Sequence, residues 1–151
     1  MKHSVTSVLT ILLITFGFTT AVSAAEAEDL IKYRKNVMSA MGGHTGAIFA
    51  IAGDKAGDKS HLAAHINSLA ATGAIVVDIF PPESADGDTR AKPEIWQQTA
   101  EFAEAVNQLE DATANLQTVF DSGDMAEMGA ALKQLGGACK NCHDNFRAKQ
   151  E

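Results

Sequence analysis

The stretch Cys139-Lys140-Asn141-Cys142-His143 decides the fold and the chemistry that this sequence predicts. Two cysteines three positions apart, with a histidine directly after the second, form the attachment motif of a c-type haem. The chain has two cysteines, and both stand in this motif. Each thiol can form a thioether with one haem vinyl group, and the imidazole can bind the iron as its proximal ligand. If the surrounding segment is helical, these three side chains fall within about 100° on one helix face.

Three other uses of a cysteine pair fit the sequence less well. A thioredoxin-like redox pair needs a strand–helix context, and no strand pattern precedes Cys139. A tetrahedral zinc site needs four ligands, and the sequence offers no second cysteine–histidine cluster at a suitable spacing. A structural disulfide would explain the two cysteines but not the histidine beside them. The motif therefore predicts one covalently attached haem c, with its iron, per chain.

The N-terminal segment 1–24 has the order of a secretory signal peptide. Lys2 and His3 form a polar start, an apolar core follows, and Val22-Ser23-Ala24 places small residues before the expected cleavage site. A membrane anchor is the alternative, but the apolar stretch is short for a span of about 20 residues. The sequence thus predicts a cleaved signal peptide, a haem-binding domain over residues 25–151, and export to the periplasm.

The composition is that of one ordinary globular domain: 151 residues, of which 46% are hydrophobic and 21% are charged, with a formal net charge of −7. An acidic chain without a basic patch argues against a nucleic-acid partner. The charge is compatible with basic redox partner proteins, and we expect the mature protein to be soluble. The sequence shows no Ser/His/Asp set, carboxylate pair or phosphate-binding glycine loop, so we expect no enzymatic activity.

Four segments of the mature chain carry apolar residues at alternating steps of three and four, the spacing of helices that bury one stripe. The stripes cover residues 30–52, 62–80, 95–120 and 125–146. Pro81-Pro82 is expected to stop the second helix, Pro93 to open the third, and Asp124 with Glu127 to cap the fourth. Short connections between them predict an all-α fold, an antiparallel up-down four-helix bundle with one covalently attached haem.

Three stretches of the sequence resemble the cytochrome c′ family, including its low-spin, methionine-ligated relatives. They are Asp29-Leu30-Ile31-Lys32-Tyr33-Arg34 followed by Met38, Arg90-Ala91-Lys92-Pro93-Glu94-Ile95-Trp96, and Cys139-Lys140-Asn141-Cys142-His143-Asp144-Asn145-Phe146-Arg147. The resemblance covers essentially the whole mature chain. A haem motif within ten residues of the C-terminus is itself informative, because ordinary small cytochromes c carry it near the N-terminus.

The resemblance implies roles for six residues. The two cysteines of the motif would attach the haem, and His143 would be the proximal iron ligand. Met38 falls where the family places the residue that faces the open side of the iron. Arg34 falls where an arginine approaches a haem propionate, and Arg147 matches an arginine near the proximal imidazole. Family members often form homodimers through their first two helices, and the sequence leaves a homodimer open.

The function that the resemblance implies depends on Met38. If its sulfur binds the iron, the protein is a low-spin carrier of single electrons between redox partners, and this is the main prediction. If the sulfur does not bind, the iron is five-coordinate and reversibly binds nitric oxide or carbon monoxide, which is the alternative. Gly42, Gly43 and Gly46 would let the first helix approach the haem and favour the sulfur bond, although they would equally allow close helix packing.

The remaining histidines and methionines have simpler interpretations. His61 and His65 lie four residues apart and could form a metal pair, but a solvated helix face is favoured because the glutamate of the zinc-protease motif is absent. His44 lies about 120° around the helix from Met38 and is a poor ligand for the iron. The other methionines on the stripes are expected to pack in the core; they are Met41, Met125 and Met128.

Overall fold

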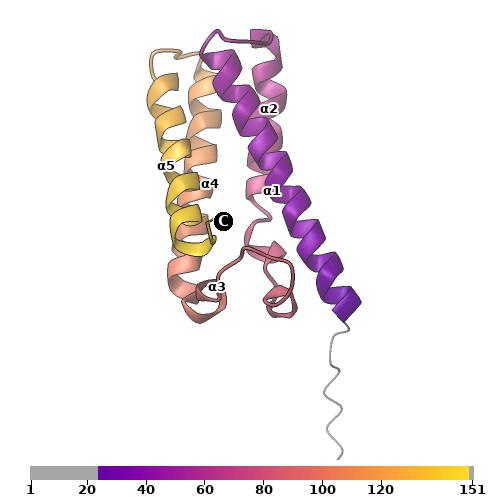
Figure 1. The fold of residues 1–151 in the computed structure, drawn as a ribbon. Helices are drawn as coiled ribbons and strands as arrows, with labels where there is room; N and C mark the ends of the chain where they lie inside the picture. Colours follow the sequence, from indigo (N-terminus) through magenta and orange to yellow (C-terminus); the bar gives the residue numbers. More distant parts are fainter. Residues whose placement is uncertain (1–23, 150–151) are drawn as a thin grey trace, which may run out of the picture.

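The structure of the protein is a computed structural model that describes residues 24–149. Its long helices are α1 (Ala24–Ala52), α2 (Leu62–Gly73), α4 (Thr99–Ser122) and α5 (Met128–Phe146), and a one-turn helix, α3 (Glu94–Gln97), precedes α4. The long helices alternate in direction, with α1 beside α2, α2 beside α4, and α4 beside α5 (Figure 1). The predicted all-α, antiparallel four-helix bundle is confirmed.

The predicted signal peptide covers residues 1–24, and all of it except Ala24 lies outside the described residues. Within residues 24–149, no helix combines the length and the apolar character that crossing a membrane would require.

One apolar core fills the space between the four long helices. Its most deeply buried side chains include Ile48 of α1, Ile66 of α2, Leu116 of α4 and Leu135 of α5, each at most 1% exposed. Burying such a side chain contributes about 1.5–3 kcal/mol, whereas isolated helices of this length are marginal in water. The helices are therefore stable because they pack together, as the predicted stripes require.

The connection between α1 and α2 depends on two residues with left-handed backbone. Asp54 has a φ of 53° and Gly57 a φ of 83°, a region that glycine adopts most readily. Asp58 follows, and its side chain accepts a hydrogen bond from the Ser60 N–H at 2.8 Å. That bond opens the 3₁₀ turn η1 (Lys59–His61), which leads directly into α2. The break that the sequence predicts after Ala52 is thus confirmed.

The second helix is shorter than predicted, because α2 ends at Gly73 and not at Phe80. Glycine is a poor helix former, and the three residues that follow Ala74 are β-branched. The chain then tightens into the 3₁₀ turn η2 (Val77–Ile79), with the Val76 N–H donating to the Gly73 carbonyl at 3.1 Å. Residues three apart share one side of such a turn, and Gly73, Val76 and Ile79 are all buried.

The third predicted helix is interrupted near its start. Gln98 has φ −118° and ψ 59°, which separates α3 from α4. The indole N–H of Trp96 donates to the Phe80 carbonyl at 3.0 Å and holds α3 against the preceding loop. Beyond this break, α4 continues to Ser122, and Gly123 ends it with a φ of 71°, shortly after the end of the predicted stripe at residue 120.

The fourth helix starts later than predicted, at Met128. The Asp124 carboxylate accepts a hydrogen bond from the Ala126 N–H at 3.1 Å, which makes a local turn instead of a helix cap. Glu127 precedes the helix without a side-chain capping bond. Met125 is consequently 50% exposed and does not pack in the core, contrary to prediction, whereas Met128 is buried.

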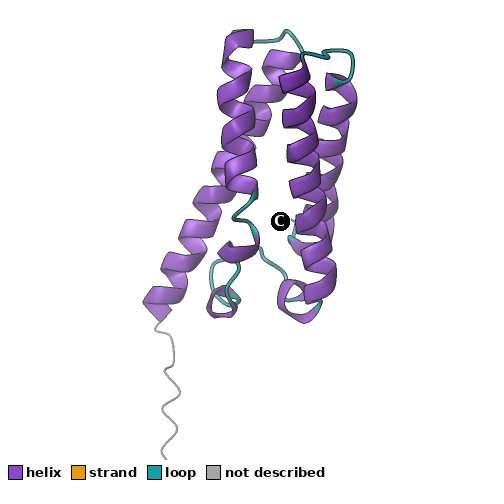
Figure 2. Ribbon diagram, turned by 180° about the vertical axis from the view of Figure 1, so that it is seen from behind, coloured by secondary structure: helices purple, strands orange, loops and turns teal. Residues whose placement is uncertain are grey.

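The long connection between α2 and α4 gathers its loops and short helices at one end of the bundle (Figure 2). It includes the 3₁₀ turn η3 (Pro82–Ser84) and is tied to the end of α5. The Lys92 N–H donates to the Phe146 carbonyl at 3.0 Å, and the Ala148 N–H donates to the Arg90 carbonyl at 2.8 Å. The Lys92 ammonium also donates to two carbonyls in the last turn of α5, where a cation is favourable. These bonds fix the loop beside the cysteine–histidine motif.

Candidate functional site

The C-terminal helix carries the cysteine–histidine motif along the wall of a cavity. Cys142 and His143 line this cavity, which has a volume of about 320 Å³. Cys139 lies one turn earlier on α5, packs against the core and is not part of the lining. Both cysteines are half-buried free thiols, so the pair is not used as a disulfide.

The cavity, called the α1–α5 cavity below, draws its walls from α1, the α2–α4 connection, α3, α4 and α5. Its lining residues are Arg34, Lys35, Met38, Ser39, Phe80, Thr89, Arg90, Ala91, Ile95, Phe102, Cys142, His143, Phe146 and Arg147.

The interior of the α1–α5 cavity is apolar. Met38 enters it from α1 and is half-buried against the core. Phe102 forms edge-to-face pairs with Phe80 and Phe146, with ring centroids 5.1 and 5.3 Å apart. Such aromatic pairs stabilise one another beyond their buried area. A flat apolar group entering this cavity would therefore meet a thioether and aromatic edges.

Arg34 is a buried cation at the wall of the α1–α5 cavity. It is 4% exposed, and its guanidinium donates to the Ser84 hydroxyl, to the Ser84 carbonyl at 3.1 Å and to the Thr89 hydroxyl at 2.9 Å. A longer contact of 3.5 Å reaches the Ile79 carbonyl. All these partners are neutral, and burial lowers the pKa of Arg34. The charge is hydrogen-bonded but lacks a carboxylate partner among the described residues.

Two further cations stand near His143. Arg90 and Arg147 are exposed and line the mouth of the α1–α5 cavity. Burial, and then the charges of Arg147 and Arg90, lower the pKa of His143, which favours the neutral imidazole that can donate a lone pair. Burial also raises the pKa of the Cys139 and Cys142 thiols.

The structure brings five of the six predicted site residues to one cavity: Arg34, Met38, Cys142, His143 and Arg147. Phe80 and Phe102 could not be assigned to the site from sequence, because residues on a core stripe and residues on a cavity wall recur at the same spacing. Ser84, which is fully buried under Arg34, was not expected at the site either. No sequence signal marks this serine, since it lies in a polar loop whose path only the folded chain defines.

The residues that are present fit a covalently attached haem. Haem is a flat apolar ring that carries two carboxylates and an iron. The α1–α5 cavity offers apolar walls, the free Cys142 thiol and the His143 imidazole, and the second free thiol, Cys139, lies one turn earlier on α5. The buried Arg34 guanidinium, which has only neutral partners, is a natural site for a carboxylate that enters the cavity.

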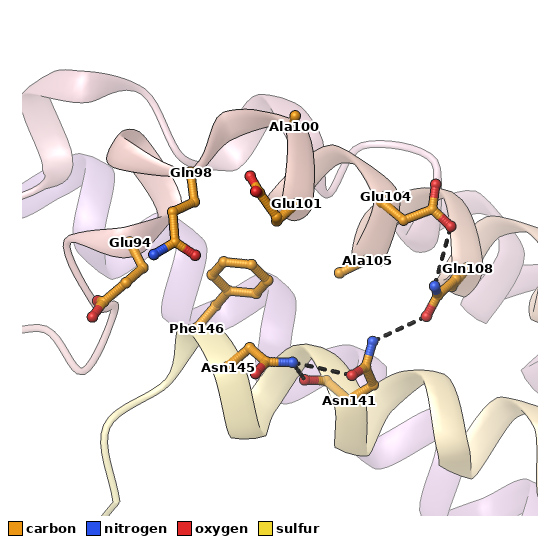
Figure 3. Close-up of a pocket in the computed structure, with 10 residues that line it drawn as sticks. All are labelled: Glu94, Gln98, Ala100, Glu101, Glu104, Ala105, Gln108, Asn141, Asn145 and Phe146. Atoms are coloured by element: carbon orange, nitrogen blue, oxygen red, sulfur yellow. Dashed lines mark hydrogen bonds between the residues drawn. The ribbon is translucent and has the colours of Figure 1, made fainter.

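A second, larger pocket, which is lined by residues of α3, α4 and α5, does not fit such a group. It has a volume of about 650 Å³, and its polar wall includes Glu94, Glu101, Glu104, Asn141 and Asn145 (Figure 3). One carboxylate oxygen of Glu94 is buried without a hydrogen-bond partner. Three carboxylates would repel the carboxylates of a haem, and no cysteine lines this pocket. The haem therefore fits the α1–α5 cavity and not this pocket.

Comparison with known proteins shows which family this chain resembles. The sequence profile of the family described as Cytochrome C' matches residues 29–147. A cytochrome c' from Pararhodospirillum photometricum is 35% identical over 124 residues, which are 82% of this chain and 99% of the relative.

Two solved structures share the fold. A nitric oxide complex of a variant cytochrome c prime from Alcaligenes xylosoxidans has a TM-score of 0.74 and 31% identity, and covers 82% of this chain and 97% of its own. A carbon monoxide-bound variant of the cytochrome c prime from the same organism has a TM-score of 0.75 and 31% identity, and covers 83% of this chain and 98% of its own.

Proposed function

The chain belongs to the cytochrome c′ family, and from this premise we propose that it is a periplasmic haem protein that binds nitric oxide or carbon monoxide. It carries one covalently attached haem c. In this proposal Cys139 and Cys142 form the thioethers, the His143 imidazole holds the iron, and Arg34 pairs with a haem carboxylate. When bound, the haem supplies an iron that can take a diatomic gas or exchange one electron.

The observation that carries the proposal is the apolar interior of the α1–α5 cavity. Met38, Phe80 and Phe102 form much of its inner wall. Among the residues that line it, His143 is the only imidazole, and no carboxylate is present. A small uncharged gas needs no proton donor and loses little hydration when it enters such a site. A dedicated peroxidase would need an acid–base group beside the iron.

Two of the matched structures support the choice of ligand. They are complexes of cytochrome c prime variants, one with nitric oxide and one with carbon monoxide. The chain covers nearly the whole length of both structures, so the comparison concerns the complete bundle and not a fragment of it. These complexes favour gas binding, the alternative in the sequence analysis, over the main prediction of a simple electron carrier.

Electron transfer with a sixth ligand is the second candidate. The observation that favours it is Met38, the methionine that lines the α1–α5 cavity. A thioether is a known haem ligand that favours the ferrous state. If the Met38 sulfur bound the iron, it would occupy the position that a gas requires. Gas binding therefore requires that the Met38 sulfur does not bind the iron, whereas the second candidate requires that it does. One measurement separates the two functions.

The test is an absorption spectrum of the ferrous holoprotein, before and after carbon monoxide is added. Gas binding predicts a broad high-spin spectrum that changes to the spectrum of a carbon monoxide complex, with one gas molecule bound per haem. A sharp low-spin spectrum that carbon monoxide leaves unchanged would overturn the proposal and establish a filled sixth position. Electron transfer would then be the better-supported function.

A further inference from the structure

Two histidines face each other between α1 and α2, outside the lining of the α1–α5 cavity. The Nδ1 atom of His44 on α1 lies 3.0 Å from the Nδ1 atom of His65 on α2. The ring centroids are 5.3 Å apart, and the ring planes are inclined by 56°. Both side chains are half-buried. From sequence, a solvated helix face was favoured for His61 and His65 over a metal pair; in the fold, His65 contacts His44.

The contact brings the two Nδ1 atoms within hydrogen-bond distance of each other. In a neutral pair, one Nδ1 carries a proton and donates it to the other. The centroid separation exceeds the Nδ1–Nδ1 distance by about twice the radius of an imidazole ring, so the two nitrogens point at each other, as an N–H···N hydrogen bond requires. Neutral imidazole nitrogen is also the commonest metal ligand in proteins. If the donating ring carries its proton on Nε2 instead, both Nδ1 atoms offer a lone pair, and a turn of the rings can aim both at a metal ion beside the line that joins them.

We propose that His44 and His65 form a binding site for a divalent transition-metal ion of the copper–nickel class. With metal–nitrogen distances of about 2.0–2.1 Å, nitrogens that lie 3.0 Å apart subtend an angle of about 95° at the ion. That angle is close to the right angle of tetragonal copper(II) and nickel(II) sites and smaller than the tetrahedral angle that zinc prefers. Among first-row divalent ions, copper also binds such ligands most tightly.

Both rings are partly exposed to solvent. Gly43 and Gly46 stand beside His44 on α1 and carry no side chain that could hinder a turn of its ring. Within four residues of His44 or His65 along the chain there is no lysine or arginine, so no cation in the adjacent turn of either helix opposes a metal ion. The half-exposed rings leave space for water to complete the coordination.

The proposed site has two protein ligands. Within the part of the chain that the structure describes, no group of three or more His, Cys, Asp or Glu side chains could hold a metal ion. His61 lies one turn before His65 but is exposed, and it has no contact with His44 in the structure of residues 24–149. It is therefore a matched control: the same residue type on the same helical segment, outside the proposed pair.

The experiment is a copper(II) titration of the ferric holoprotein, so that the haem iron cannot reduce the copper. Isothermal calorimetry gives the affinity, and electron paramagnetic resonance counts the nitrogen donors from their hyperfine splitting. The variants are His44→Ala, His65→Ala and His61→Ala, each checked for an unchanged helical circular dichroism and haem spectrum. We expect one copper ion with two nitrogen donors, at least tenfold weaker binding in the first two variants, and less than twofold change in the third.

Two results would overturn the proposal. Copper bound to the wild type with fewer than two nitrogen donors would leave the pair as a hydrogen bond alone, and this measurement needs no variant. Loss of binding in His61→Ala with full binding in His44→Ala would place the copper on the outer face of α2 instead. Because the proposed site lies outside the α1–α5 cavity, the outcome is independent of the carbon monoxide experiment.

Discussion

The guanidinium carbon of Arg34 lies 4.9 Å from the centroid of the Phe80 ring, over its face. This cation–π contact comes in addition to the hydrogen bonds from Arg34 to Ser84 and Thr89. One side chain of α1 thereby fixes the path of the connection between α2 and α3, which supplies part of the wall of the α1–α5 cavity. The stability of that wall should depend on Arg34.

Replacing Arg34 by alanine should lower the free energy of unfolding by about 3 kcal/mol. The variant loses several charge-assisted hydrogen bonds and a cation–π contact, and it leaves Ser84 buried without its donor. Urea unfolding of the holoprotein at pH 7, followed by circular dichroism, measures the loss. Lys32→Ala, an exposed cation on the same helix, should change it by less than about 0.5 kcal/mol. Equal losses in the two variants would show that the buried bonds do not stabilise the fold.

Two glycines with positive φ should respond differently to alanine. At Gly57 a Cβ would lie 2.7 Å from the Cγ1 atom of the buried Ile51, whereas at Gly123 it would meet no atom within 4 Å. Both variants carry the cost of alanine in left-handed backbone, about 1–2 kcal/mol, and Gly57→Ala adds overpacking of about 1–3 kcal/mol. The urea concentration at the midpoint of unfolding should therefore fall further for Gly57→Ala than for Gly123→Ala. If the two variants lost the same stability, the crowding of the new Cβ against Ile51 would not contribute to the free energy of unfolding.

The ion pair between Lys35 and Asp88 should contribute to stability only above acidic pH. The hydrogen bond from Lys35, and then its charge, lower the pKa of Asp88, so the folded state releases the proton more readily than the unfolded state. The stabilisation is present above the unfolded pKa of about 3.9 and is lost as the pH falls through the folded pKa.

Asp88→Asn is the variant that tests this pH dependence. Its urea midpoint should lie slightly below that of the wild type at pH 7, and the two midpoints should converge as the pH falls through the lowered pKa of Asp88, because the wild-type carboxylate is then protonated as well. Asp86→Asn is the control, since Asp86 forms no ion pair with another residue of 24–149. A difference between Asp88→Asn and wild type that persisted at low pH would point to a contact other than the charge.

Most of the bundle could be predicted from sequence, because its helices are amphipathic and their ends carry ordinary stop signals. The interruption at Gln98 could not be predicted, since neither proline nor glycine marks it. The early end of α2 could not be predicted from the spacing of apolar residues either. Gly73, Val76 and Ile79 lie three residues apart, and this spacing buries them together both in an α-helix and in a 3₁₀ turn.

The part of the candidate site that attaches a haem could be predicted from sequence, because this chemistry requires particular residue types. The cysteines and His143 stand at a fixed spacing, and Met38, Arg34 and Arg147 followed from resemblance to a family. Long-range partners were not predictable. Ser84 meets Arg34 across 50 positions and His44 meets His65 across 21, and such contacts depend on how loops and helices pack.

Single replacements of Cys139 and Cys142 by alanine should each leave the haem attached by one thioether. One vinyl group would then remain conjugated with the porphyrin, so the absorption band of the denatured reduced haem should shift to longer wavelength. The double variant should lose its haem when the denatured protein is extracted with acidified acetone. Mass spectrometry of the denatured chains checks the attachment. A single variant without covalent haem would mean that one thioether does not suffice, and an unshifted band would place the attachment elsewhere.

Met38→Ala and Met38→Leu together decide how α1 controls access to the iron. In the gas-binding proposal Met38 acts by its bulk, so alanine should speed carbon monoxide association about tenfold, equivalent to a barrier lower by ~1.4 kcal/mol. Leucine, which has a similar volume, should leave the rate near that of the wild type. Stopped-flow mixing of the ferrous holoprotein with carbon monoxide measures both rates. If the Met38 sulfur were an iron ligand instead, both variants would change from a low-spin to a high-spin spectrum before any gas was added, because leucine can fill the space of a thioether but cannot bind iron.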